Sequence, residues 1–233
     1  MLDFAGTIIV TASMVIVVAA VINALDIPRT AKLGLTAIIG LWIGLQAALA
    51  AAGAFAGQFS RDFPLVGLML ATPLLATAVA AGTSRNVRAA LLALPQPLLI
   101  GLNTTRLAGA FFLLLAASGR LSGPFPYSAG WGDIAAAALA LPLAFAVARG
   151  PRPSATFWWN VLSTVDLLAA VTLGTLSAEG TPFQLIHAGV GSQAVAHLPW
   201  SLIPTVLVPV FLILHGVIFA QLRAAQPQRL VTS

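Results

Sequence analysis

The chain contains no cysteine, and only 7% of its 233 residues are charged. The absence of cysteine excludes disulfides, thiolate nucleophiles, cysteine-ligated metal centres and palmitoylation. The charged share is about a quarter of that found in soluble domains, while hydrophobic residues make up 59% of the chain. Such a chain cannot cover a soluble core with polar surface, so we expect an all-α polytopic helix bundle in a lipid bilayer.

The absence of several other residues and motifs excludes further classes of function. No lysine follows Lys32, which excludes a retinal Schiff base in the last helix. The chain has six acidic residues in all, and it has no paired-aspartate motif, His-Glu-x-x-His, Gly-x-Ser-x-Gly or P-loop. No lysine/arginine cluster with interleaved aromatic residues occurs, so nucleic acid is not an expected partner. We therefore expect neither an enzyme nor a bound cofactor.

Seven apolar stretches are long enough to cross a bilayer, which takes roughly 20 helical residues. They cover about residues 4–25, 33–54, 64–82, 97–118, 128–148, 157–177 and 201–222. We expect them to form one transmembrane domain over residues 1–222, followed by a short cytoplasmic tail at residues 223–233. The apolar piece within residues 86–96 is too short to span by itself. It is interpreted as an interfacial or connecting helix, with inclusion in a span as the alternative.

Positive charge alternates between the connections. Those after the first, third, fifth and seventh stretches hold eight cations, namely Arg29, Lys32, Arg85, Arg88, Arg149, Arg152, Arg223 and Arg229. The remaining connections hold Arg61 and Arg120. Because cytoplasmic loops carry an excess of lysine and arginine, this pattern predicts the N-terminus outside and the C-terminus in the cytoplasm.

Arg106 lies near the middle of the apolar stretch 97–118. An arginine at that depth costs at least ~2.5–3.5 kcal/mol, so it should face protein or water. In the predicted topology, Arg106, Asp166 and His215 lie about 12, 13 and 10 Å from the cytoplasmic helix ends. Asn103 and Thr104 lie about one turn below Arg106. These residues predict a polar site inside the bundle.

Two functions fit such a site. In the first, the protein transports or senses a proton or a small polar or anionic solute. Arg106 would then hold a negative group, Asp166 would balance the charge of the empty site, and His215 would tune or relay protonation. In the second, an Arg106–Asp166 ion pair fixes helix packing in a structural or accessory subunit. That subunit would contact a membrane-protein partner or further copies of itself.

Three more side chains could take part in a site near the predicted outer surface. Asp133 lies at the outer mouth of stretch 128–148, where we expect it to cap the helix N-terminus, with ligand binding as the alternative. His187 and His197 share the last outer loop and raise a third interpretation, a haem- or metal-binding redox protein. They are ten residues apart, and the only nearby acid is Glu179. This is poor ligand spacing, so no metal is expected.

The run Arg106–Ile134, RLAGAFFLLLAASGRLSGPFPYSAGWGDI, precedes an aspartate-bearing helix and a last helix with proline and histidine. In these features the chain resembles a group of uncharacterised bacterial multi-pass proteins of about seven helices. The Arg-x-x-Gly and Gly-Asp-Ile pieces carry the resemblance. It implies a location in the bacterial inner membrane and implies no activity.

Overall fold

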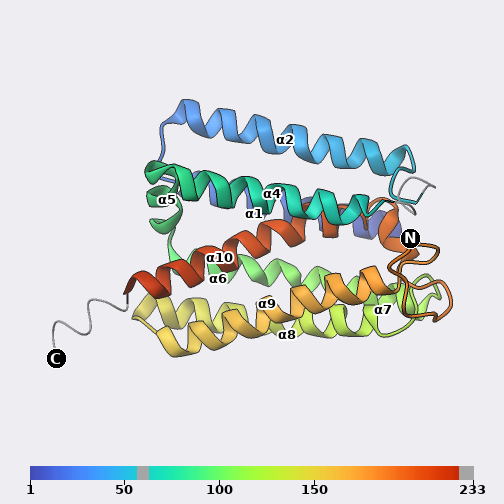
Figure 1. Cartoon of the computed structure of the whole chain (residues 1–233). Helices are drawn as coiled ribbons and strands as arrows, with labels where there is room; N and C mark the ends of the chain where they lie inside the picture. Colours follow the sequence, from blue (N-terminus) through green and yellow to red (C-terminus); the bar gives the residue numbers. More distant parts are fainter. Residues whose placement is uncertain (57–62, 226–233) are drawn as a thin grey trace.

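The computed structural model describes residues 1–56 and 63–225, and within them it is helical with no strand (Figure 1). Seven of its helices are long and apolar enough to cross a membrane. The prediction of an all-α chain with seven such helices is therefore confirmed. The predicted connection residue Arg61 and residues 226–233 of the predicted tail lie outside the described residues.

The seven long helices follow one another along the chain. They are α1 (Leu2–Ala24), α2 (Arg29–Ala51), α4 (Leu65–Thr83), the composite span Gln96–Ala117, α8 (Phe125–Arg149), α9 (Pro153–Leu176) and the composite span Ile203–Ala225. The short helix α5 (Arg85–Leu92) joins α4 to the composite span that follows it. Residues 86–95 therefore belong to a separate connecting helix and its link to the next span, which begins at Gln96.

Local chemistry explains where several helices begin. Proline occupies the first turn of α9 at Pro153 and of α8 at Pro126, where its missing N–H costs nothing and its fixed φ suits the helix. Ser84 caps α5, since its hydroxyl accepts a hydrogen bond from the backbone N–H of Val87 at 3.3 Å. Because α8 begins at Phe125, it starts three residues before the predicted boundary.

The span that carries Arg106 is not one continuous α-helix. It consists of α6 (Gln96–Leu102), the 3₁₀-helix η1 (Asn103–Gly109) and α7 (Ala110–Ala117). Side chains bond to the backbone at the junction: Asn103 Nδ2 donates to the Leu99 carbonyl at 3.0 Å, and Thr105 Oγ1 donates to the Leu102 carbonyl at 2.8 Å. Such side-chain bonds compete with regular helix geometry. The predicted span over residues 97–118 corresponds to Gln96–Ala117, with this irregular segment in its middle.

The last span is also irregular where it begins. Residues Ile203–Leu207 form a π-helix, η3, before α10 (Val208–Ala225). Pro204 lies in this turn and has no N–H to donate, and Thr205 Oγ1 donates to the Ser201 carbonyl at 2.7 Å. Short π turns occur mostly as local insertions in α-helices and are frequent at functional sites.

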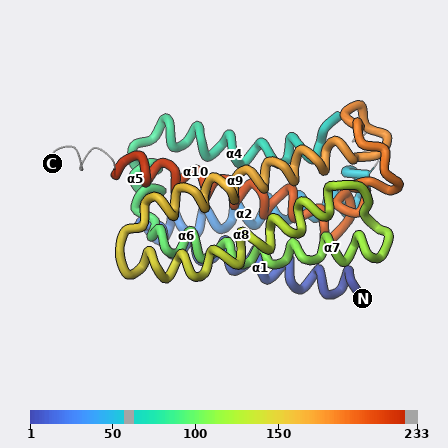
Figure 2. The backbone as a smooth tube through the Cα atoms, turned by 90° about the horizontal axis from the view of Figure 1, so that it is seen from below, coloured from blue at the N-terminus to red at the C-terminus, as the bar shows by residue number. Residues whose placement is uncertain are grey.

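The helices differ in how deeply they pack. α8 and α9 lie side by side, η1 packs on α8, and α10 contacts both α4 and α9 (Figures 1 and 2). By contrast, α2 and α4 lie at the periphery. Only Gln46 and Ala50 of α2 and Leu65 of α4 are fully buried. The site described below is therefore built by α8, α9, α10 and the interrupted span.

The connections fall at two ends of the bundle (Figure 1). The α1–α2, α4–α5 and α8–α9 connections and the end of α10 lie at one end, and the N-terminus lies at the other. The long segment between α9 and η3 covers the N-terminal end. Gly191 (φ +53°) ties this segment to the α7–α8 connection, since its N–H donates to Ser122 Oγ at 2.7 Å. A side chain at Gly191 would collide with the Ser177 carbonyl, so the crossing requires glycine.

Candidate functional site

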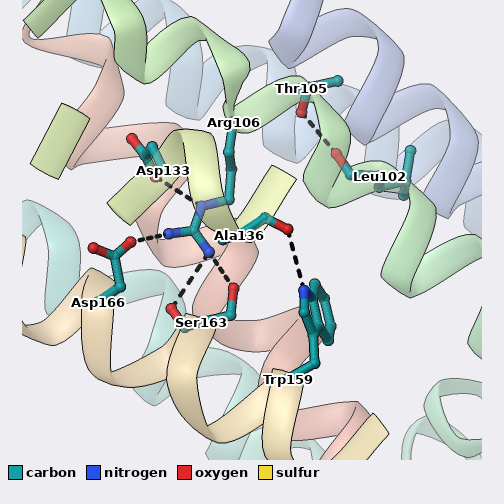
Figure 3. A network of polar contacts seen from close by, with 8 residues as sticks. All are labelled: Leu102, Thr105, Arg106, Asp133, Ala136, Trp159, Ser163 and Asp166. Atoms are coloured by element: carbon teal, nitrogen blue, oxygen red, sulfur yellow. Dashed lines mark hydrogen bonds and ion pairs between the residues drawn. The ribbon is translucent and has the colours of Figure 1, made fainter. Parts of the chain in front are cut away.

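Arg106 is buried between α8 and α9, with 3% of its surface exposed. Its Nε donates to Asp133 Oδ1 of α8 at 2.7 Å, and its Nη2 donates to Asp166 Oδ2 of α9. Its Nη1 donates to both oxygens of Ser163, to Oγ at 2.5 Å and to the carbonyl at 3.3 Å (Figure 3). We call these four residues, Arg106, Asp133, Ser163 and Asp166, the charge centre.

Charge is unbalanced in the charge centre. One guanidinium faces two carboxylates, so the formal charge is −1 when both acids are ionised. The Arg106 side chain is 1% exposed, whereas the side chains of Asp133 and Asp166 are each 15% exposed. Neither Asp133 Oδ2 nor Asp166 Oδ1 has a hydrogen-bond partner among the described residues. Each acid thus keeps one oxygen free to bind a proton or a cation.

Two glycines make room for the carboxylates. A Cβ at Gly109, at the end of η1, would collide with the Asp133 side chain, and a Cβ at Gly132 of α8 would collide with the Asp166 carboxylate. Glycine at these positions allows η1, α8 and α9 to approach closely enough for three charged groups to meet. Gly109 is the glycine of the Arg-x-x-Gly piece, and Gly132 is that of the Gly-Asp-Ile piece.

The residue at which α8 begins determines how deep Asp133 lies in the bundle. Its predicted N-cap role is wrong, because α8 begins at Phe125 and Asp133 is its ninth residue. At 1.5 Å per residue, this places Asp133 about 12 Å along the helix from its start. It therefore reaches the level of Arg106 instead of the mouth of the bundle. Asp166, expected at that level from its distance along α9, does contact Arg106.

His215 forms its hydrogen bonds with Asn160 and not with the charge centre. Its Nδ1 hydrogen-bonds Asn160 Oδ1 at 2.7 Å, and Asn160 Nδ2 donates to the His215 carbonyl at 3.1 Å. The residue of α10 that faces Arg106 is Phe211, one turn earlier, whose ring centroid is 6.0 Å from the Arg106 Cζ. The expected grouping of His215 with Arg106 is thus replaced by an Asn160–His215 pair. His215 Nε2 is buried and has no partner among the described residues.

The other predicted site residues contribute differently. Asn103 bonds its own helix, and Thr104 Oγ1 is buried with no partner in the described part of the chain. His187 and His197 are exposed in the segment between α9 and η3. Within residues 1–56 and 63–225, no three side chains of histidine, cysteine, aspartate or glutamate group together as metal ligands.

Two cavities meet at the charge centre. The smaller, about 20 Å³, lies beside Arg106 and is walled by residues of η1, η3 and α10, including Thr105, Leu207 and Phe211. This is about the space of one water molecule. The larger, about 340 Å³, extends between α4 and α9 towards the N-terminal end of the bundle. Asp133 lines both cavities and therefore connects the charge centre to the larger one.

The contacts limit what Arg106 can do. All three guanidinium nitrogens already donate to protein oxygens. Four of its five N–H groups are used in this way, so an anionic ligand would find one remaining N–H on Nη2. Such a ligand would also add to an existing negative excess. The chemistry available at this site is reversible binding of a proton or cation by Asp133 and Asp166, with Arg106 as the fixed counter-charge.

Sequence reasoning missed Ser163 as a ligand of Arg106. The sequence did carry an indication of this role, because Ser163 lies three residues before Asp166 and shares its helix face.

The comparisons with known proteins add a family but no activity. No curated protein and no solved structure matches the chain. The sequence model of one family, described as a domain of unknown function (DUF8737), matches residues 63–223. Because this match covers most of the chain and the whole charge centre, the protein belongs to the DUF8737 family.

Proposed function

We propose that the protein is a membrane transporter that uses the charge centre to bind protons in exchange for a small cationic solute. The observation that carries this proposal is the pairing of one buried guanidinium with two partly exposed carboxylates. An uncompensated negative charge within a span is costly, so a proton or a cation that removes it is bound favourably. Two occupants that neutralise the same carboxylate compete, and such competition is the basis of exchange.

Irregular backbone on both sides of the small cavity supports transport. The 3₁₀-helix η1 supplies Arg106 on one side, and the π-helix η3 supplies Ile203 and Leu207 on the other. Local departures from α-helical geometry at membrane depth are tolerated where neighbouring groups satisfy the freed backbone atoms or where the segment lines a cavity. In transporters, interrupted helices commonly form the substrate and ion sites.

We also propose a bacterial inner-membrane location with the N-terminus outside. The end of the bundle that we place in the cytoplasm carries most of the described cations, Arg29, Lys32, Arg85, Arg88, Arg149, Arg152 and Arg223. The opposite end carries Arg120 among the described residues. This asymmetry follows the positive-inside rule.

Single cysteines can test the orientation because the chain has none of its own. Ser154 and Leu185 are exposed and lie near opposite ends of the bundle. In intact cells, a membrane-impermeant maleimide should label Leu185→Cys, and it should label Ser154→Cys only after the membrane is permeabilised. The reverse pattern would contradict the proposed orientation.

Substitutions that keep the side-chain shape and remove one negative charge test the transport proposal. Asp133→Asn and Asp166→Asn each leave one carboxylate opposite Arg106, so the centre becomes neutral and the protein should still fold. In liposomes loaded with tetraethylammonium and a pH-sensitive dye, the outward gradient of this organic cation should drive proton uptake through the wild-type protein by exchange. Both variants should fall to the level of empty liposomes, because the exchangeable negative charge is gone.

The matched control for this assay is Asp26→Asn, which removes an exposed acid from the α1–α2 connection. It should transport protons like the wild-type protein. Wild-type flux that persists in both charge-centre variants would refute the proposal. Folded wild-type protein that shows no flux and whose stability responds to no ligand would favour the structural or accessory subunit, especially if it co-purifies with a partner.

A further inference from the structure

The larger cavity, which we call the α4–α9 cleft, has the dimensions of a small-molecule site. Its volume of about 340 Å³ lies within the range of about 300–1,000 Å³ seen for ligand pockets. The cleft is bounded by the start of α4, the second half of α9, the start of the last span and the segment before it. Its walls are largely apolar, formed by side chains such as Leu65, Leu70, Leu167, Val171 and Val208.

The charged groups of the α4–α9 cleft are of one sign. Asp133 lies where the cleft meets the charge centre, and Glu179 lies in the loop just after α9. Among the described residues that line the cleft there is no lysine or arginine, and His197 is the one histidine. Arg106 lies behind Asp133 in the smaller cavity, with its guanidinium held by the charge centre. An anion entering the cleft would therefore be repelled.

Aromatic residues add to the preference for positive charge. Phe55, Phe112, Phe125 and Phe183 all line the α4–α9 cleft. Aromatic faces attract organic cations, by about 0.5–2 kcal/mol per contact according to exposure. A small hydrated metal ion would leave the apolar walls unused. An uncharged apolar molecule would gain nothing from Asp133. The combination fits a molecule with an apolar body and a single positive charge.

We infer that the α4–α9 cleft binds an amphiphilic organic cation, with its apolar body between α4 and α9 and its charge directed towards Asp133. The competition of this cation with protons rests on the proposed function, whereas its binding in the cleft does not. A cation at Asp133 removes the same negative excess that a proton would remove. The chemistry of the cleft thereby indicates which class of solute would be exchanged for protons.

Two ions of the same shape and opposite charge test this inference, tetraphenylphosphonium and tetraphenylborate. The full-length protein in lipid nanodiscs should bind radiolabelled tetraphenylphosphonium saturably, above the signal of empty nanodiscs. Tetraphenylborate should not compete for that site. Asp133→Asn should weaken tetraphenylphosphonium binding roughly tenfold or more, because it removes a charge contact in a water-poor site.

Two further variants separate the role of shape from that of charge. Ala170→Trp places a large side chain in the cleft without changing any charge and should abolish binding. Asp26→Asn, an exposed acid far from the cleft, should bind like the wild-type protein. Absence of saturable tetraphenylphosphonium binding, or equal competition by tetraphenylborate, would overturn the inference.

The failure of this inference is distinguishable from the failure of the proposed function. Proton flux that depends on Asp133 and Asp166, without saturable tetraphenylphosphonium binding, would overturn the cleft inference and leave the proton site intact. Saturable, Asp133-dependent binding that is insensitive to pH, in a protein without proton flux, would refute the exchange and support the cleft as a cation site.

Discussion

Replacing Arg106 with glutamine should be the most damaging change at the charge centre, because it leaves two acids without their counter-charge. Asp133 and Asp166 both bond Arg106, and each is largely buried. Removing one partner of a buried ion pair typically lowers the free energy of unfolding by about 3–5 kcal/mol. We expect Arg106→Gln to lower the thermal unfolding temperature in detergent and to reduce the amount of protein in the membrane.

Arg120 provides a matched control for this prediction. It forms an exposed ion pair with Asp3, in which Arg120 Nη1 lies 2.7 Å from Asp3 Oδ1. The Arg120 side chain is 36% exposed and the Asp3 side chain 54%. Exposed pairs contribute about 0–1 kcal/mol, so Arg120→Gln should be nearly neutral. If Arg106→Gln proved as stable as Arg120→Gln, the charge centre would contribute little to folding and its charges would not be tightly coupled.

A neutral charge centre distinguishes stability from function. The triple variant Arg106→Gln, Asp133→Asn, Asp166→Asn should regain much of the stability lost in Arg106→Gln, because no charge is left uncompensated. If it also regained proton transport, the charge centre would be a packing device. We expect the triple variant to fold and to remain inactive.

The seven-helix architecture could be predicted from the sequence because the bilayer sets a strict length for apolar segments. Each predicted span overlaps a long helix, and boundaries differ by a few residues, as at the start of α9, Pro153 against a predicted 157. The depth of Asp166 in the bilayer followed from counting residues from the predicted end of its helix. Counting residues from the helix ends therefore brought Arg106 and Asp166 to one level without any knowledge of helix order.

The remainder of the charge centre could not be predicted, for two physical reasons. The position of Asp133 depended on where α8 begins, and an error of three residues left it about one turn below the surface. The lateral order of helices leaves little trace in one sequence. Gly109 and Gly132 were the available clue, since small residues mark where helices approach closely. Their partners become evident only once the helices are placed.

The two irregular turns were also beyond sequence reasoning. Asn103, Thr104 and Thr105 form a polar run inside an apolar stretch, and such side chains can bond the backbone in place of regular helix contacts. The π-helix η3 contains Pro204, which at most predicted a disturbed helix. Neither pattern specifies which helix type results, because tertiary contacts decide between them.

Gly109→Ala should strongly disrupt the charge centre although Gly109 is uncharged and lies beside it. A Cβ at this position would collide with the Cβ of Asp133, and both atoms are fixed by their backbones. The two segments must therefore separate, which stretches the 2.7 Å contact between Arg106 and Asp133. Overpacking of this kind costs about 1–3 kcal/mol. We expect a lower unfolding temperature together with reduced proton flux.

The control for Gly109→Ala is Gly216→Ala in α10, where an added Cβ meets no atom within 4 Å. That variant should unfold at the wild-type temperature or slightly above it, since alanine favours a helix over glycine. The Asp133→Asn background gives a second check, because asparagine keeps the Cβ while removing the charge. Gly109→Ala should lower the unfolding temperature in that background as well. A loss seen only when Asp133 is charged would instead assign the effect to electrostatics and contradict the close approach of η1 and α8 as its cause.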